Sequence, residues 1–293
     1  MNFSEKLRTL RKQYKLSQEQ LAEKINVSRQ AITKWETEGG LPDIENLLAI
    51  AALFSVSLDE LLSEEKLICK MPDYAYESVT EYDISCPTQF DIHVPGAAEV
   101  VVATAENEKL RVRLASNVLQ TLPRDYKAQL DEHRNRMDVD IRRVGQSSEA
   151  EGKKALVVHV SLPARYCEGV ELSVSTEILR LNGTGFPIEF DGSVKSVYLD
   201  GVKGVVALNC NTDMDIYADE LPDAIEINQI NATSTLHIAC GTQCFTKVKG
   251  KSNRIRFTID GKPAESSANA DAECRIELAG MNSELLVDQR TVK

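Results

Sequence analysis

Apolar residues follow two different spacings along the chain. Up to about residue 62 they recur every three to four positions, as on one face of an α-helix. From residue 82 onwards they alternate with polar residues, as in β-strands that have one buried face. The first spacing predicts helices over 4–13, from Ser17 to a break at Asn26, over 28–36, over 43–54 and over 58–62.

Runs of alternating apolar residues predict the first strands. Each run ends at Gly, Pro or Asn-rich residues, as strands do. The runs are Phe90-Ile92-Val94, Val100-Val102, Leu110-Val112-Leu114, Met137-Val139-Ile141, Leu156-Val158-Val160 and Val170-Leu172-Val174. Between them, we expect a long loop or a short helix over 119–135 and a flexible hairpin tip over 145–154.

An apolar-x-apolar-x-x-apolar pattern recurs in the C-terminal third. It starts at Val197, at Ile225 and at Ile276, and each copy is followed six residues later by another apolar residue. The offsets of 28 and 51 residues predict a degenerate copy near Ile255 and Phe257. Strand pairs that recur in this way indicate a β-solenoid, with a plain β-sandwich as the alternative. This half resembles the adhesin-like β-repeat domains that bacteria attach to regulators and membrane proteins.

The two spacings predict a two-domain chain. Its 293 residues are too many for one small helical domain. We expect an all-α five-helix domain over 1–66, a linker over 67–81 that is acidic and contains Pro72, and an all-β domain over 82–293.

The stretch from Leu16 to Glu36 carries the first candidate site. Ser17 is a good N-cap, and Gln20 completes a capping box. Asn26 accepts the left-handed backbone that a tight turn between helices needs. Two short helices joined so closely meet at a steep angle, which is the geometry of a helix-turn-helix.

The second helix of this motif has an apolar face and a polar face. Ile32 and Trp35 are expected to point into the core. The polar face can hydrogen-bond base edges or phosphates, and it consists of Arg29, Gln30, Thr33 and Lys34. The alternative is an unrelated αα-corner whose polar residues only face solvent, but the complete helical unit around the motif favours DNA binding.

Residues 3–64 resemble the Xre/Cro-type repressor helix-turn-helix family. The motifs that carry the resemblance are S-Q-x-x-L-A, V-S-R-Q-A-I-x-K-W-E and L-P-D-I-x-x-L-x-x-I-A-x-L-F-x-V-S-L-D-E-L-L. Asn26 stands where the family usually has Gly, a conservative change for a left-handed position. The resemblance also implies that Arg11 pairs with Glu36 as a structural brace and not as a DNA contact.

The same resemblance assigns side chains to DNA. Gln18 and Ser28 would anchor helix N-termini on phosphates, where backbone N–H groups favour anions. Arg29 would bond guanine and Gln30 would bond adenine in the major groove. The two residues one turn later would reach bases or the flanking backbone. The complete set is Gln18, Ser28, Arg29, Gln30, Thr33 and Lys34.

Charge is distributed unevenly along the chain. The formal net charge is -11, yet residues 1–35 hold 8 Lys and Arg against 3 Asp and Glu, a balance of +5. A small basic surface on an acidic protein suits selective, salt-sensitive binding of double-stranded DNA, because the acidic remainder is repelled by phosphate.

The β-rich half lacks the usual signatures of a catalytic or metal site. The four histidines are scattered without metal-ligand spacing, and no phosphate-binding glycine loop occurs. We therefore expect no enzyme activity and no cofactor. A thiol or soft-metal sensor built from Cys210, Cys240, Cys244 and Cys274 is an alternative, since both 30-residue intervals approach the repeat. We favour small apolar residues at inward positions, because the chain contains no CxxC motif.

The chain is expected to be cytoplasmic, with reduced thiols and no membrane insertion. It shows no secretory signal, and its longest apolar run, 47–54, is too short to cross a bilayer. We expect a homodimeric transcription regulator, a repressor, whose β-domain assembles the dimer or responds to an unknown effector or protein partner. The alternative is a DNA-tethered interaction protein whose β-domain binds a protein or envelope partner.

Overall fold

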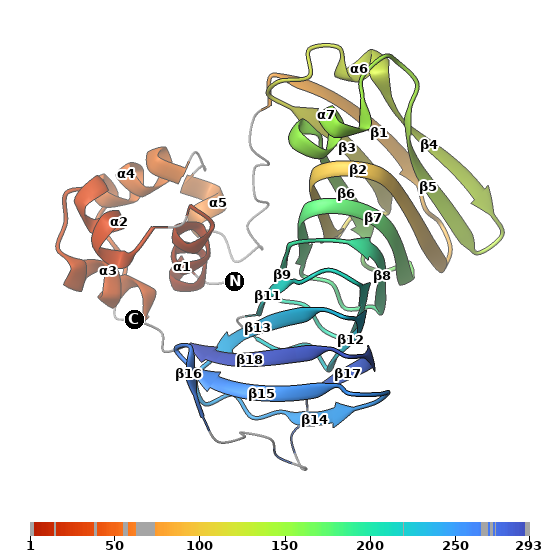
Figure 1. The fold of residues 1–293 in the computed structure, drawn as a ribbon. Helices are drawn as coiled ribbons and strands as arrows, with labels where there is room; N and C mark the ends of the chain where they lie inside the picture. The colour runs from red at the N-terminus through yellow and green to blue at the C-terminus, as the bar shows by residue number, and fades with distance from the viewer. Residues whose placement is uncertain are drawn as a thin grey trace. The chain divides into compact units, whose positions relative to one another are not determined.

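The computed structural model divides the chain by its internal contacts into two units, residues 1–73 and residues 74–293. Figure 1 shows the helical unit in red and orange and the β-rich unit from yellow to blue. Each unit has its own apolar core. The residues that the structure describes are 3–14, 16–37, 40–54, 58–62, 74–218, 220–264, 269, 272 and 274–290.

The first unit consists of short helices around one apolar core. Their bounds are α1 (Phe3–Gln13), α2 (Gln18–Lys24), α3 (Arg29–Glu36), α4 (Ile44–Phe54) and α5 (Leu58–Leu62). One fully buried residue from each helix meets in this core: Leu7, Leu21, Ile32, Ile50 and Leu61. The predicted helical N-terminal part is confirmed.

Only part of the apolar surface of α4 reaches the core. The helix begins as expected, because the Asn46 N–H donates to Asp43 Oδ1 at 2.9 Å. Leu47 is buried, whereas Ile44 is 71% exposed and Leu48 is 51% exposed. The helix therefore carries more apolar residues than its own domain covers.

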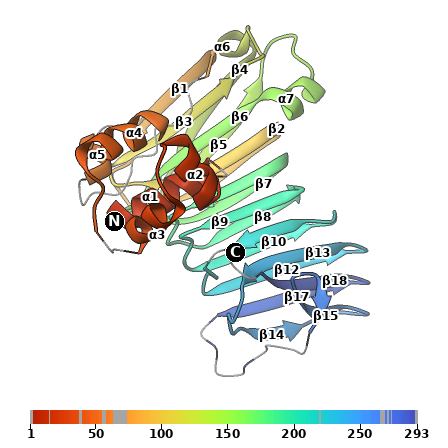
Figure 2. The same cartoon turned by 90° about the vertical axis from the view of Figure 1, so that its left-hand side faces the viewer.

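The second unit begins with a group of mostly long strands. Their bounds, with two short helices, are β1 (Tyr76–Asp83), β2 (Thr88–Ala105), β3 (Lys109–Ser116), α6 (Leu122–Asp125), β4 (Tyr126–His133), β5 (Arg136–Arg143), α7 (Glu149–Ala155), β6 (Val157–Pro163) and β7 (Cys167–Asn182). β2 pairs in parallel with β5 and β6 along one edge and with β7 along the other. Antiparallel pairs join β1 to β3, β3 to β6 and β4 to β5. The long strands lie across the upper half of Figure 2.

Shorter strands continue the unit. Their bounds are β8 (Ile188–Ser193), β9 (Ser196–Asp200), β10 (Val205–Cys210), β11 (Asp215–Ala218), β12 (Ala224–Ile230), β13 (Thr233–Ala239), β14 (Phe245–Val248), β15 (Arg254–Ile259), β16 (Lys262–Pro263), β17 (Arg275–Met281) and β18 (Glu284–Arg290). One parallel series runs β7, β8, β10, β12, β17, β14. A second runs β7, β9, β11, β13, β18, β15. The predicted β-rich domain is therefore confirmed.

The order of strands in space differs from their order in sequence at two places. β2 lies between β7 and the strands β5 and β6, which follow it in the chain. β17 and β18 lie between β12 and β13 on one side and β14 and β15 on the other. The last strands of the described chain therefore complete the interior of the stack.

One apolar core runs through this unit because the strands alternate. In β10 the buried Val206 and Leu208 alternate with the half-buried Val205 and Ala207. Parallel pairing in register places apolar residues of neighbouring strands side by side, so each strand extends the core of the one before.

The structural repeat is shorter than the one predicted. Ile188 pairs with Val206, and Val206 pairs with Ile225, so equivalent positions are 18 and 19 residues apart. Val197 pairs with Ile216, so the predicted offset of 28 residues from Val197 to Ile225 is wrong. It matched a strand of one series with a strand of the other, because both strands carry the same alternation.

The later copies of the predicted repeat agree with the structure. Ile225 pairs with Ile276, as the offset of 51 residues requires. The extra copy near Ile255 and Phe257 is also present as β15, although it pairs with β18 from the outer side. The long interval thus arises from a strand pair inserted in the sequence but displaced in space.

Two segments expected to be irregular contain regular structure. Residues 119–135 hold α6 and β4, and β4 was missed because its outward face is charged. Residues 145–154 were expected to be a flexible tip but contain most of α7. Ser148 caps this helix, and Glu151 completes a capping box with it. The prediction failed because this Ser-x-x-Glu signal was passed over in favour of the glycines around it.

The second unit begins before residue 82. β1 starts at Tyr76 and pairs with β3 over its whole length, so 76–81 are strand residues and not linker. β1 lies at an edge with mostly exposed or half-buried side chains, and for that reason its polar sequence was taken for a linker. Residues 67–73 of the expected linker lie outside the described residues.

Candidate nucleic-acid interface

Side-chain caps fix the two helices of the motif. Gln20 N–H donates to the Ser17 hydroxyl at 3.1 Å and Ser17 N–H donates to Gln20 Oε1 at 2.8 Å, which is the predicted capping box. Asn26 adopts the left-handed conformation expected of it, with φ at 56°. Ser28 then caps α3 by accepting the Ala31 N–H at 3.2 Å.

α3 is anchored by one face and presents the other. Ile32 and Trp35 are buried in the helical core, as predicted. The opposite face is a surface depression of about 540 Å³, lined by Arg29, Gln30, Thr33, Lys34 and Thr37. All of these side chains are exposed, so their donors and acceptors are available to a ligand.

The predicted brace between α1 and α3 is present. Arg11 Nε lies 2.6 Å from Glu36 Oε1, and Arg11 Nη2 lies 2.9 Å from Glu36 Oε2, so the pair is bidentate. Arg11 also donates to the Leu16 carbonyl at 2.9 Å. The Glu36 side chain is 1% exposed and that of Arg11 is 14% exposed. The pair therefore lies inside the domain and away from the exposed face of α3.

Gln18 belongs to the same network. Its Nε2 donates to Glu36 Oε2 at 2.8 Å, and its Oε1 accepts from the Thr33 hydroxyl at 3.1 Å. Sequence reasoning missed these bonds, because no spacing rule connects position 18 with positions 33 and 36. They fix the Gln18 side chain at the start of α2, beside the exposed face of α3.

The four-cysteine cluster does not form. Cys244 and Cys274 are neighbours, since Phe245 N–H donates to the Cys274 carbonyl at 2.8 Å, but Cys210 pairs along the sheet with Gly192. Burial raises the pKa of Cys244 to about 11, which makes a reactive thiolate unfavourable. Among the described residues there is no group of three or more His, Cys, Asp or Glu that could hold a metal ion.

The described helices were also compared with the requirements of a membrane span. None of them has the length and apolar character needed to cross a bilayer.

Comparisons with known proteins agree with the geometry of the first unit. Residues 7–61 match the family model described as helix-turn-helix. These residues form a helix-turn-helix domain. The transcriptional activator BcrR of Enterococcus faecalis is 56% identical over 68 residues, which cover 23% of this chain and 33% of BcrR. The immunity repressor protein of Bacillus phage phi105 is 34% identical over 85 residues, which cover 29% of this chain and 58% of that protein. The chain thus spans between a third and three fifths of the length of these relatives.

The part that follows the helix-turn-helix domain is similar to a solved structure. A candidate cell adhesion protein of Clostridium sporogenes aligns with a TM-score of 0.38 and 10% sequence identity, covering 74% of this chain and 99% of that one. The predicted resemblance to adhesin-like proteins is found, at a TM-score that carries no conclusion about function.

Proposed function

We propose that the chain is a sequence-specific DNA-binding transcription regulator that reads the major groove with α3. The observation that carries the proposal is the division of α3 into two faces. Ile32 and Trp35 hold the helix in its core, while four hydrogen-bonding side chains stand exposed on the other side. A helix presented in this way fits the width of the major groove. The similarity of the helix-turn-helix domain to named transcription regulators supports it and favours a non-enzymatic role.

Each polar side chain has a proposed part in DNA binding. Arg29 forms a bidentate contact with guanine O6 and N7, and Gln30 forms the equivalent contact with adenine N6 and N7. Thr33 and Lys34 reach bases or the flanking backbone. Ser28 and the N-terminus of α3 meet a phosphate.

Gln18 has a proposed phosphate contact that its surroundings support. Nε2 carries two hydrogens, of which one is donated to Glu36, so a second remains for DNA. Because Thr33 holds the amide oxygen, the amide is oriented before DNA arrives. The Arg11–Glu36 pair then acts on DNA binding only through Gln18 and through the stability of the domain.

We propose a homodimer, since one such domain contacts a single half-site and specific binding needs two half-sites about 34–36 Å apart. The exposed Ile44 and Leu48 of α4 offer one apolar surface for assembly. The β-rich unit offers another, and we propose that its two parallel series form successive turns of a β-solenoid. The unit then has regular surfaces on which a second copy, an effector or a protein partner could be received.

We propose repression as the sign of regulation, because occupancy of a promoter by the reading helix is sufficient to block it. The similarity to a phage immunity repressor supports this, whereas the similarity to BcrR favours activation. The alternative proposal is an interaction protein, in which the helix-turn-helix domain tethers the β-rich unit to DNA and that unit binds a protein or envelope partner.

Selection of bound sequences from a random DNA library tests the proposal. The full chain is compared with an Arg29→Ala variant at fixed salt concentration, since phosphate contacts depend strongly on salt. We expect the full chain to select an inverted repeat and the variant to lose one base preference in each half-site. A single half-site without symmetry would contradict the homodimer and favour the interaction protein. Retention of no sequence at all would contradict sequence-specific reading.

A further inference from the structure

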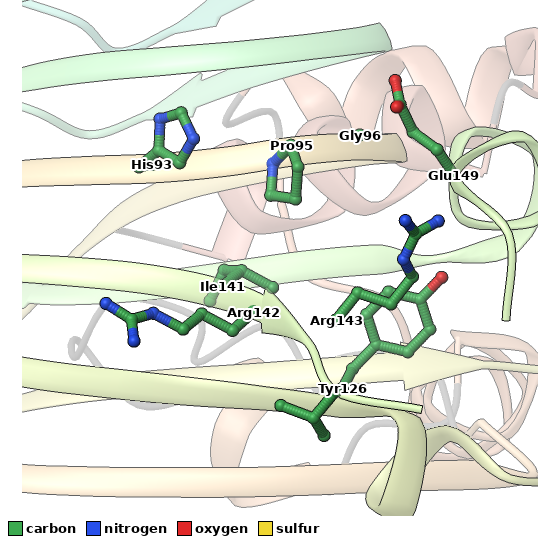
Figure 3. A pocket seen from close by; sticks show the side chains of 9 residues that line it. His93, Pro95, Gly96, Tyr126, Ile141, Arg142, Arg143 and Glu149 are labelled. Carbon is green, nitrogen blue, oxygen red and sulfur yellow. The ribbon is translucent and has the colours of Figure 1, made fainter. Parts of the chain in front are cut away.

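A cavity of about 370 Å³ lies in the β-rich unit where β5 ends and α7 begins (Figure 3). β2 runs beside β5 only as far as His93 and beside β6 only from Glu99. Between these points β2 passes through Pro95 and Gly96, where its register with β7 shifts. The interval between β5 and β6 is therefore filled by α7, and the cavity opens beside this helix.

Two glycines let α7 approach the wall of the cavity. A Cβ atom at Gly96 would lie 2.9 Å from Lys153 Cγ, and one at Gly152 would lie 2.8 Å from the Tyr126 hydroxyl. Side chains at these positions would push the helix outward. The close approach buries the Tyr126 ring under α7.

The Tyr126 hydroxyl has no hydrogen-bond partner within the described residues, although Tyr126 is only 2% exposed. Burial raises the pKa of this hydroxyl, so at neutral pH it keeps its proton and remains a donor. A buried donor without an acceptor costs stability, and a ligand oxygen that accepted from it would recover that cost.

Arg143 supplies a positive charge at the same place. It stands directly opposite Tyr126 in the β4–β5 pair. Its guanidinium makes no hydrogen bond or ion pair with another described residue, although its charge acts on Tyr126 and on Glu149. Glu149 is engaged by Lys153, whose Nζ lies 2.8 Å from its carboxylate. Figure 3 shows the Arg143 guanidinium and the Tyr126 hydroxyl pointing to the same side.

A second cationic edge lies across the cavity. His93 and Arg142 come from β2 and β5, and Figure 3 shows their side chains together, apart from Arg143. Arg142 is held by Asp140, with Nη2 3.0 Å from Oδ2. Arg143 is thus the guanidinium of this cavity that retains its full set of donors for a ligand.

We propose that this cavity binds a small molecule through an oxyanion, either a phosphate or a carboxylate, held by the Arg143 guanidinium and the Tyr126 hydroxyl. The planar guanidinium matches two oxygens of either group, and the neutral hydroxyl adds a donor without a further charge. The volume lies within the range of small-ligand sites, about 300–1,000 Å³. The site belongs to the β-rich unit alone and does not depend on the proposed DNA binding.

Calorimetric titration of the full chain, without DNA, tests the site. The probes are inorganic phosphate, phenyl phosphate and benzoate, with sodium chloride at equal ionic strength as the blank. We expect saturable binding of at least one probe, and the probes distinguish a phosphate site from a carboxylate site. Absence of saturable binding for all three would overturn the proposal.

Three variants separate a built site from general charge attraction. Arg143→Gln should lower affinity about tenfold or more, because it removes charge-assisted hydrogen bonds. Arg124→Gln removes the same charge from the exposed surface of α6 and should leave affinity unchanged. Tyr126→Phe should lower affinity without lowering the thermal midpoint of the ligand-free protein, since it removes an unsatisfied hydroxyl. Equal losses for the two arginine variants, or full affinity in Arg143→Gln, would overturn the proposal.

Discussion

Replacing Glu36 by Gln removes the negative charge from the network that joins α1, α2 and α3. The Glu36 carboxylate accepts two bonds from Arg11 and one from Gln18, all between 2.6 and 2.9 Å. A glutamine keeps one acceptor oxygen, but its amide nitrogen then faces a donor. The Arg11 guanidinium is left mostly buried without a counter-charge.

The expected loss is large compared with the stability of the domain. Breaking a buried ion pair by removing one partner costs about 3–5 kcal/mol. Gln retains part of the bonding, so we expect about 3 kcal/mol, the lower end of that range. A domain of this size has a free energy of unfolding of roughly 3–9 kcal/mol. The variant should therefore unfold at markedly lower denaturant concentration.

Trp35 provides a local measurement, because it is the chain's single tryptophan and lies buried beside Glu36. Urea unfolding of the full chain, followed by tryptophan fluorescence, reports on the helix-turn-helix domain alone. Glu23→Gln removes an exposed charge from α2 and should change the free energy of unfolding by less than about 0.5 kcal/mol.

A double variant, Arg11→Met with Glu36→Leu, tests the reasoning directly. It leaves no unpaired buried charge, so it should be considerably more stable than Glu36→Gln alone. A loss below about 1 kcal/mol in Glu36→Gln would contradict the reasoning, given the expected 3–5 kcal/mol for a broken buried pair. So would a double variant as unstable as the single one.

Three further outcomes are expected. Arg29→Ala should cost about 1–3 kcal/mol on the selected site and relax one base preference, whereas Lys34→Ala should weaken all sequences alike; gel-shift titrations on single-base variants separate the two. Ser148→Ala should lower the stability of the β-rich unit by about 1 kcal/mol through loss of the α7 cap, measured by circular dichroism in urea, with Ser148→Asp retaining it. Burial lowers the pKa of His159 to about 4, against about 6.5 in an unfolded chain. Between these values only the unfolded chain takes up the proton, so stability is complete above pH 6.5 and falls by up to about 3 kcal/mol as the pH drops towards 4. His159→Leu should remove this component of the pH dependence, and an unchanged slope would contradict the assignment.

The sequence was most informative where local chemistry decides the structure. The capping box at Ser17 and the left-handed turn at Asn26 depend on a few neighbouring residues, and both are present. The same capping signal at Ser148 was available but was outweighed by the adjacent glycines. Reading that signal first would have predicted α7, and with it one wall of the proposed ligand site.

Long-range pairing was much harder to predict. Alternation identifies a strand but not its neighbour, because every strand of a parallel stack carries the same period of two. Val197 and Ile225 were matched for this reason, although they belong to different series. The contacts of Gln18 with Thr33 and Glu36, and the pairing of Arg143 opposite Tyr126, likewise arise only when distant segments meet.

The inserted position of β17 and β18 has a consequence for synthesis on the ribosome. Translation delivers β14 and β15 first, yet within the described residues their parallel partners are β17 and β18, which emerge later. Until then β12 and β13 present open edges to which early strands can attach in the wrong place. Completion of this end of the protein therefore waits for residues 275–290. A truncation before them would leave both the growing stack and β14 and β15 without their native neighbours.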